Sequence, residues 1–284
     1  MKIGVNTLLW TAAFDRPNLP LIGELKGRGF DAIEIARFDW AGVAAALAPE
    51  IRREAEAQGI GVIACSAFTS SECCFATGSA AARQAGTEFL ERAIDATAAM
   101  GANLLVGPFH GPVGYLAGRR RNAAEWSHMV DSLRAAGDYA HAAGVRIAIE
   151  PLNRFETYVM NTAADAARLC DEVAHPAIGI LYDTFHANIE EKSQGEGLTA
   201  AGGHLFHVHT CENDRGAPGS GHVEWEEVVA RLKAMNYDGY LVIESFGFAI
   251  KEIAAAACIW RDLAPTPETI AWDGLKFLRG ATSY

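Results

Sequence analysis

Short apolar runs alternate with longer amphipathic segments along the whole chain. The runs are rich in valine, isoleucine and leucine, which is typical of buried parallel strands. The segments between them carry charges at helical spacing, and several end at a glycine, which is typical of helices. The expected strands are 3–9, 30–36, 60–67, 103–107, 145–150, 178–183, 205–209 and 240–244, and the expected helices are 19–27, 41–58, 79–100, 123–143, 162–173, 188–201, 225–235, 248–263 and 269–278.

Eight strands separated by helices predict a parallel sheet. Eight β/α units in a chain of 284 residues match the size of a closed (β/α)8 TIM barrel. A doubly wound open sheet is the alternative, but it usually carries a glycine-rich loop after its first strand. Here that loop is Thr7-Leu-Leu-Trp-Thr-Ala-Ala13, which contains no glycine. No proline- or serine-rich linker interrupts the pattern, so we expect residues 1–284 to form a single TIM-barrel domain.

The bulk composition is that of an ordinary folded protein with one large core. Half of the residues are hydrophobic, 21% are charged and the mean hydropathy is +0.06. The formal net charge of −11 argues against a protein that binds duplex nucleic acid, which usually has the opposite balance. The basic run 119–121 is short, and we interpret it as a solvated turn. No apolar run approaches the length that spans a membrane.

Cysteine usage indicates a reducing compartment. The chain holds no Cys-x-x-Cys pair, and the adjacent Cys73 and Cys74 have poor geometry for a disulfide. Met1-Lys2 leads directly into the first expected strand, with no visible signal peptide. We therefore expect a cytoplasmic protein with reduced thiols. The cysteines are Cys65, Cys73, Cys74, Cys170, Cys211 and Cys258.

Four consecutive strands end at a residue that can bind a metal ion: Glu150, Asp183, His209 and Glu244. In a TIM barrel the carboxyl ends of the strands meet at one mouth, so these side chains are expected to face one another. A single acid at a strand end can pair with an arginine or cap a helix, but four in succession are hard to explain separately. Three carboxylates and one imidazole suit Mn²⁺, Mg²⁺ or Co²⁺. The sequence therefore predicts one divalent metal ion.

Polar residues follow these candidate ligands on the same loops. Glu156, His186 and Arg215 lie within a few positions of a ligand, where polar groups can fix a substrate. His207 stands two positions before His209, and we interpret it as a structural, hydrogen-bonded histidine that faces away from the site.

The motifs in the second half of the chain resemble one known family. They are Glu150-Pro-Leu-Asn-Arg-Phe-Glu156, Asp183-Thr-Phe-His186, His207-Val-His209 followed by Glu212-Asn-Asp-Arg215-Gly, Gly219-Ser-Gly221 with Trp225, and Glu244-Ser-Phe246. In order and spacing they are similar to the D-tagatose/D-psicose (allulose) 3-epimerases, which belong to the xylose-isomerase-like TIM barrels. The first half is matched mainly by its architecture.

The resemblance implies a metal-dependent isomerase that interconverts free ketoses at C3. It implies one divalent ion, usually Mn²⁺, on the four candidate ligands. Residues matching Glu156, His186 and Arg215 would hold the O1/O2 end of an open-chain ketose. Glu150 and Glu244 would remove and return the C3 proton on opposite faces of a cis-enediolate. A homodimer or homotetramer is also implied.

The chain departs from the family pattern where the far end of the sugar would lie. Asn6 or Thr7 stands where a large aromatic residue is usual, and Gly107-Pro-Phe-His-Gly-Pro112 stands where a tryptophan is common. Apolar walls discriminate modestly, so we expect several ketoses to be accepted. The candidate walls are Phe14, Phe109, His110 and Phe246.

Other functions remain open at this point. An aldose–ketose isomerase, a hydroxypyruvate isomerase or an inosose-processing enzyme could share the fold, which alone does not separate them. A metal-dependent endonuclease-type phosphodiesterase would need a multi-metal cluster and a basic face for DNA, and the net charge opposes it. A phosphorylated sugar is disfavoured because the mouth offers one clear arginine and no glycine-rich anion cradle. A non-catalytic metal- or sugar-binding protein would need the same pocket.

Overall fold

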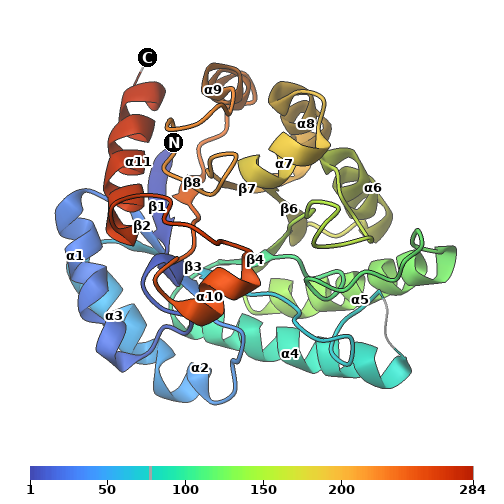
Figure 1. Cartoon of the computed structure of the whole chain (residues 1–284). Helices are drawn as coiled ribbons and strands as arrows, with labels where there is room; N and C mark the ends of the chain where they lie inside the picture. The colour runs from blue at the N-terminus through green and yellow to red at the C-terminus, as the bar shows by residue number, and fades with distance from the viewer. Residues whose placement is uncertain (77–78, 284) are drawn as a thin grey trace.

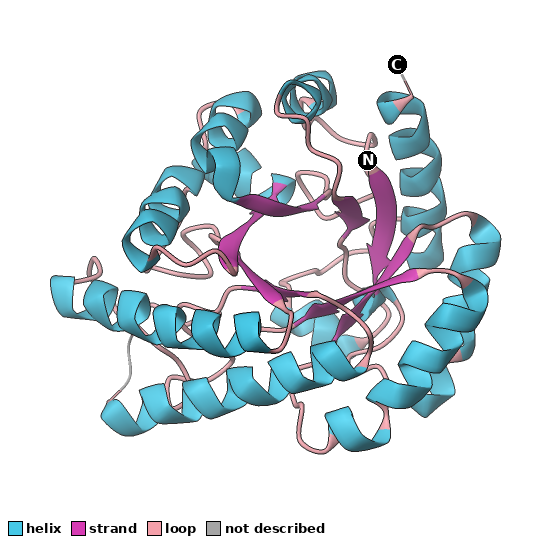
Figure 2. Cartoon of the chain, turned by 180° about the vertical axis from the view of Figure 1, so that it is seen from behind, coloured by secondary structure: helices cyan, strands magenta, loops and turns pink. Residues whose placement is uncertain are grey.

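The computed structural model describes residues 1–76 and 79–283, and in these residues eight parallel strands close into a barrel (Figures 1 and 2). Each strand pairs with the next along the chain, and β8 returns to pair with β1. The predicted TIM barrel is therefore confirmed. The strands are β1 (Lys2–Asn6), β2 (Ala32–Ala36), β3 (Gly61–Cys65), β4 (Leu104–Gly107), β5 (Arg146–Ile149), β6 (Ile178–Asp183), β7 (Leu205–His209) and β8 (Tyr240–Ile243).

Helices surround the barrel and cover the outer face of the strands (Figure 2). Large apolar side chains fill the layer between strands and helices, and this layer is the main hydrophobic core. The helices are α1 (Pro20–Arg28), α2 (Val43–Ala46), α3 (Ala48–Gln58), α4 (Ala80–Ala99), α5 (Ala123–Ala142), α6 (Ala163–Val173), α7 (Thr184–Glu190), α8 (Gln194–Ala201), α9 (Trp225–Ala234), α10 (Lys251–Ala256) and α11 (Pro267–Thr282).

A smaller cluster of buried apolar residues fills the inside of the barrel, and its members are mostly short side chains. Side chains two positions apart on a strand share a face. Ala32 and Ala36 of β2 belong to this inner cluster, so Glu34 between them points into the barrel as well. The barrel interior therefore contains a buried carboxylate among small apolar groups.

Several expected elements have different bounds in the structure. The first strand ends at Asn6 rather than at residue 9, because the Asn6 side chain accepts a hydrogen bond from Leu8 N and starts a 3₁₀ turn (Thr7–Leu9). The expected helix 41–58 is divided into α2 and α3 around Leu47, with Pro49 in the first turn of α3. Proline fits that first turn because its missing N–H would have no partner there.

The two least regular predictions also change. The expected helix 188–201 is two helices, and the first of them, α7, begins at Thr184 because Asp183 caps it directly. The expected helix 248–263 shrinks to α10, followed by a loop that reaches the last helix. These segments follow β6 and β8, where the chain builds the mouth of the barrel.

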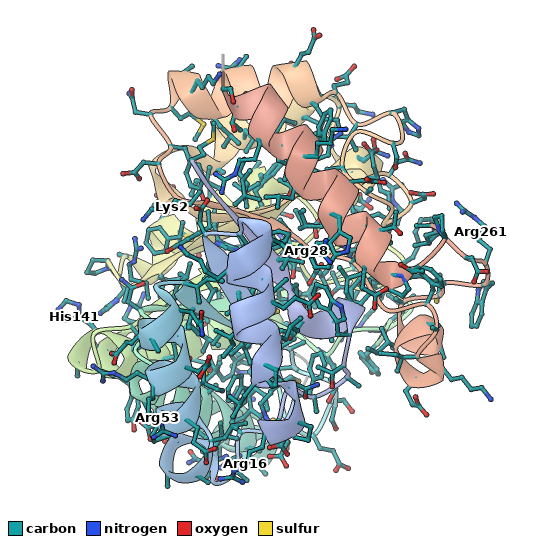
Figure 3. The ribbon with its side chains drawn as sticks, turned by 90° about the vertical axis from the view of Figure 1, so that its left-hand side faces the viewer. Lys2, Arg16, Arg28, Arg53, His141 and Arg261 are labelled. Carbon is teal, nitrogen blue, oxygen red and sulfur yellow. The ribbon has the colours of Figure 1, made fainter. Side chains whose placement is uncertain are left out.

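The two ends of the barrel are distinct. In the side view Lys2, at the start of β1, and Arg261, in the loop after α10, lie at opposite ends (Figure 3). The carboxyl ends of the strands and α10 share the end that faces the viewer in Figure 1. Within residues 1–76 and 79–283, no helix has the length and apolar character needed to cross a membrane.

Candidate active site

The four candidate metal ligands all lie at the carboxyl ends of strands β5 to β8. Asp183 and His209 are the last residues of β6 and β7, and they are partners in the strand register. Glu150 and Glu244 follow directly after β5 and β8. Side-chain oxygen or nitrogen atoms of the four lie within 4.8 Å of one another, and all four residues are buried. The predicted convergence at one mouth is therefore what the structure shows.

Asp183 serves both a helix and the site. Its Oδ1 accepts hydrogen bonds from the backbone N–H groups of Phe185 and His186, at 2.6 and 3.3 Å, and so caps α7. Its Oδ2 is left to face the cluster, 3.7 Å from His209 Nδ1. A local capping interaction thus fixes the direction of a candidate ligand.

His209 Nδ1 is surrounded by carboxylate oxygens. It lies 3.4 Å from Glu244 Oε2 and 3.9 Å from Glu150 Oε1. Among the residues that the structure describes, neither His209 Nδ1 nor Glu150 Oε1 has a hydrogen-bond partner, although both atoms are buried. Buried polar atoms without partners are rare, and two that converge with carboxylates are the arrangement expected of metal ligands. The residues present therefore fit a divalent cation.

The pKa shifts of residues in the cluster also indicate a site for a cation. Burial, followed by the charge of Glu244, holds the pKa of Glu150 well above its usual range. Burial opposes charge on His209 too, yet the Glu34 and Glu244 carboxylates raise its pKa well above the usual value. Neighbouring carboxylates contribute to both shifts, and a divalent cation would neutralise part of their negative charge. Oxygen-rich sites of this kind suit hard cations such as Mn²⁺ or Mg²⁺.

Arg215 is the cation already present in the cluster. Its Nη1 donates to Asp183 Oδ2 at 2.8 Å and to Glu244 Oε2 at 2.9 Å. The guanidinium carbon lies 4.0 Å from the centre of the Phe185 ring and 4.9 Å from that of Phe246, so cation–π contacts also hold it. Burial opposes the charge, but Asp183 and its neighbours raise the pKa of Arg215, which stays charged.

His186 lies beside Arg215 and Glu150 near the start of α7. The neutral His186 ring accepts at Nδ1 from the backbone N–H of Asn153, at 3.1 Å, and Arg215 Nη2, which can only donate, lies 3.1 Å from its Nε2. That nitrogen lies 3.5 Å from Glu150 Oε1. Burial lowers the pKa of His186 and favours this neutral form. Asn153 also donates to Glu156 Oε1 at 2.8 Å, and therefore organises two of the predicted substrate-binding residues.

A cavity of about 340 Å³ opens above the cluster, large enough for a small molecule. Its polar floor contains the predicted residues Glu150, Glu156, His186, Arg215 and Glu244. The rest of its wall is largely apolar and includes residues of α10, which the sequence did not link to the site. The wall also includes Leu8, Cys65, Ser66, Pro108, Leu152 and Phe246.

Three predicted wall residues are not among the described residues that line the cavity. Phe14 is fully buried in the main core, and Phe109 packs there with its ring 5.8 Å from that of Phe68. His110 is also fully buried, and its Nε2 lies 3.0 Å from the backbone oxygen of Glu150. Burial lowers the pKa of His110 to about 4, so this histidine is neutral. Of the four predicted walls, Phe246 is the one that lines the cavity.

The interpretation of His207 is wrong in one respect. It is hydrogen-bonded, as expected, but it shares a face with His209 because the two are two positions apart on a strand. Both rings reach Glu34 of β2 across the barrel, with nitrogen–oxygen distances of 2.8 Å. Sequence reasoning did not place Glu34 in the site, although an acid within an apolar strand was a visible signal.

Comparisons with known proteins identify the class. The family model described as xylose isomerase-like TIM barrel matches residues 22–280. The chain therefore belongs to the xylose isomerase-like TIM-barrel family, as the motifs predicted.

Within that family its relatives form a narrower group. The chain is 37% identical to a "probable ketose 3-epimerase" of Synechocystis sp., over 98% of this chain and 96% of that protein. It is 32% identical to a D-psicose 3-epimerase of Agrobacterium fabrum, over 93% and 91% of the two chains. A crystal structure of a D-psicose 3-epimerase in the presence of D-fructose superposes with a TM-score of 0.89 at 29% identity, covering 100% of both chains.

Proposed function

We propose that this protein is a metal-dependent ketose 3-epimerase that acts on free sugars. The observation that carries the proposal is the cluster of Glu150, Asp183, His209 and Glu244, of which the two glutamates line the cavity. Their strands follow one another around the barrel, so the two glutamates stand at the two ends of the arc. This arrangement supports a role for one carboxylate on each side of a substrate bound over the cluster.

The residues that would hold the metal ion are the same four, and Mn²⁺ is the proposed ion, with Mg²⁺ and Co²⁺ as alternatives. When bound, the ion supplies a Lewis acid that polarises the C2 carbonyl and so acidifies the proton on C3. The remaining chemistry belongs to side chains of this chain.

Glu150 and Glu244 are the proposed proton-transfer residues. One carboxylate removes the C3 proton from one face, which leaves a cis-enediolate of the sugar. The other carboxylic acid delivers a proton to the opposite face of C3 and so inverts that centre. Each turnover exchanges the protonation states of the two glutamates, and the reverse reaction or exchange with solvent restores them.

Three residues are proposed to hold the O1/O2 end of the ketose. His186 presents its Nε2 beside Glu150 and Arg215, Arg215 presents its guanidinium, and Glu156 accepts hydrogen bonds from hydroxyl groups. The apolar wall, with Phe246, covers the rest of the sugar. Since Arg215 is already paired with two carboxylates, and no other described lining residue is a lysine or an arginine, the cavity supports an unphosphorylated substrate.

The oligomeric state and the cellular location of the protein are also proposed. We propose a homodimer or homotetramer in the cytoplasm, as the resemblance implies. Exposed large apolar side chains in loops that follow strand ends at the mouth support an interface between copies. These are Phe38, Tyr115, Leu116, Phe155 and Trp260.

Deuterium exchange at C3 tests the function. The Mn²⁺-loaded protein is incubated in D₂O with D-fructose, D-psicose, D-tagatose and D-ribulose, and C3–H loss and epimer formation are followed by NMR. Deuterium at C3 together with the matching epimer is the expected result. Exchange at C1 with an aldose product would instead assign an aldose–ketose isomerase. A metal-loaded protein that exchanges no proton in any of these sugars would overturn the ketose proposal.

A further inference from the structure

A buried carboxylate lies inside the barrel beneath the candidate metal ligands. Glu34 of β2 is fully buried, and its two oxygens contact two histidines of β7. Oε1 lies 2.8 Å from His209 Nε2, and Oε2 lies 2.8 Å from His207 Nε2. Glu34 is separated from His209 by 175 positions in the chain, so barrel closure alone brings the two together.

All the groups that contact Glu34 in this network are donors. The Asn6 side-chain amide donates to Glu34 Oε1 at 2.7 Å. Because a carboxylate only accepts hydrogen bonds, both histidines present an N–H at Nε2. In the neutral ring, which is the form that binds a metal ion, His209 Nδ1 then carries the lone pair, and this atom faces the carboxylates of the cluster. The contacts of Glu34 therefore select the tautomer that binds a metal ion.

We propose that Glu34 is a positioning residue for the metal centre. It fixes the ring and the tautomer of His209, and its negative charge makes the imidazole a stronger ligand. His207 holds the second oxygen of Glu34 and so prevents the carboxylate from rotating away. This inference rests on the proposed metal-dependent function, but it concerns metal binding and is independent of which ketose is the substrate.

A second metal ion at Glu34, His207 and His209 is the competing interpretation, since these side chains also lie close together. The contacts of 2.8 Å between Glu34 and the rings are hydrogen-bond distances. Each Nε2 is thus engaged directly by the carboxylate, whereas a metal ion would stand between them with ligand distances of about 2.0–2.2 Å. The hydrogen-bonded network is therefore the interpretation that the geometry favours.

Two variants separate the charge of Glu34 from its hydrogen bonds. In Glu34→Gln, the amide oxygen can keep the bonds to Asn6 and His209, while the amide NH₂ faces His207. The His207 ring can adapt by moving its proton to Nδ1, which has no partner among the described residues. Glu34→Ala removes all three hydrogen bonds, to Asn6, His207 and His209. We expect the Kd for Mn²⁺ to rise by about 10- to 100-fold in Glu34→Ala and by less in Glu34→Gln.

Metal titration of the whole protein by calorimetry is the test, with the electronic spectrum of the Co²⁺-loaded protein as a second readout. Glu125→Gln is the matched control, because it replaces a buried carboxylate whose hydrogen bonds come from Arg119, Asn122 and Tyr158 and not from the candidate ligands. The control should bind Mn²⁺ like the wild type, while both Glu34 variants bind more weakly and shift the Co²⁺ bands.

The outcomes separate the two proposals. If the wild type binds one metal ion and the Glu34 variants bind it equally well, the positioning role is wrong while the epimerase proposal stands. Binding of two ions per chain, one of them lost in the Glu34 variants, would favour the second-metal interpretation. If Glu34→Ala does not fold, the Kd and spectrum of Glu34→Gln decide. A wild type that binds no divalent ion would overturn both proposals.

Discussion

Glu150 and Glu244 are chemically alike but differ in their surroundings. Glu244 accepts a hydrogen bond from Arg215, whereas Glu150 Oε1 has no partner among the residues described and lies near the His186 ring. The two carboxylates also approach the cavity from different strands, β8 and β5. Each glutamate is therefore expected to serve one of the two faces of the substrate.

This difference predicts that Glu150→Gln and Glu244→Gln will each exchange the C3 proton of a different epimer. Glu150→Gln should leave Glu244 able to exchange the C3 proton of one epimer with retention, while interconversion falls by at least about 100-fold. Glu244→Gln should show exchange in the other epimer. Incubation of each epimer separately in D₂O, with metal content measured, checks this. Exchange of both epimers by one single variant would show that a single residue serves both faces.

The sequence identified most of the polar residues of the site, because each ends or follows a strand. It did not identify Cys211, whose thiol donates to the backbone oxygen of Glu244 at 2.8 Å and lies 3.1 Å from Arg215 Nη1. Burial raises the pKa of this thiol well above its usual value, so it is a neutral donor here. Nothing in the local sequence separates it from the other cysteines.

At the scale of elements, α5 begins with a reinforced cap. Asn122 and Glu125 form a capping box, and Arg119 donates to both oxygens of Glu125 at 3.0 and 2.7 Å. Tyr158 O–H donates to Glu125 as well, at 2.8 Å. The Arg119 hydrogen bonds, partly offset by burial, lower the pKa of Glu125 from 4.5 to about 2.

This shift predicts a pH-dependent contribution to stability. Because the folded pKa lies below the unfolded one, the contribution is complete above about pH 4.5 and is lost as the pH falls toward about 2. Glu125→Gln should lower the free energy of unfolding at pH 7 by about 1–2 kcal/mol. Urea unfolding of the wild type and of Glu125→Gln should show that the difference between their free energies of unfolding becomes smaller from pH 7 to pH 3.5. If this difference stays constant with pH, the destabilisation of Glu125→Gln comes from altered packing and not from the lost charge.

A glycine at the end of β4 permits a close strand contact. Gly107 has φ of +144°, and a Cβ there would collide with the backbone oxygen of Ser66. Ser66 lines the cavity, and Gly107 O accepts from Glu150 N at 3.1 Å. This glycine therefore helps to set the position of both a wall and a candidate ligand.

Replacement of this glycine should be costly. We expect Gly107→Ala to destabilise the fold by about 3 kcal/mol or more, because strain and a backbone clash add together. The midpoint of urea unfolding measures this. Gly118→Ala is the control, since it also has a positive φ, +69°, but nothing lies within 4 Å of its added Cβ. If Gly107→Ala and Gly118→Ala lose the same amount of stability, backbone strain alone explains the effect at Gly107, without a clash.

At the scale of the whole molecule, the candidate metal site joins the last four strands of the barrel. The three carboxylates of the cluster repel one another, and Arg215 offsets part of that repulsion. A bound divalent ion would offset the rest and would stabilise the folded state, because the unfolded chain has no such site.

Metal removal should therefore lower thermal stability. At free Mn²⁺ of about 100 times Kd, binding contributes about 2.7 kcal/mol, which is about 4 to 5 °C in Tm for a chain of this size. Calorimetric scans with a chelator and with graded Mn²⁺ should show this shift. Asp183→Asn should reduce it. A Tm independent of Mn²⁺ would contradict a metal ion on these ligands.

The sequence by itself determined the barrel, the order of its strands and the four candidate ligands. These depend on short-range patterns: apolar strands, amphipathic helices and a polar residue at each strand end, which the topology of parallel barrels gathers at one mouth. Asp183 illustrates this, because its strand end and candidate ligand role were predicted from the sequence, whereas its capping of α7 was found only in the structure.

Only the tertiary structure decided what surrounds those ligands. Glu34 reaches His209 across the barrel, α10 lies along the cavity, and Phe14 and Phe109 are in the core rather than at the wall. Each of these depends on contacts between residues far apart in sequence. Local patterns can mark a residue such as Glu34 as unusual, but they do not say which distant residue it contacts, because closure of the barrel and packing of side chains fix which distant groups meet.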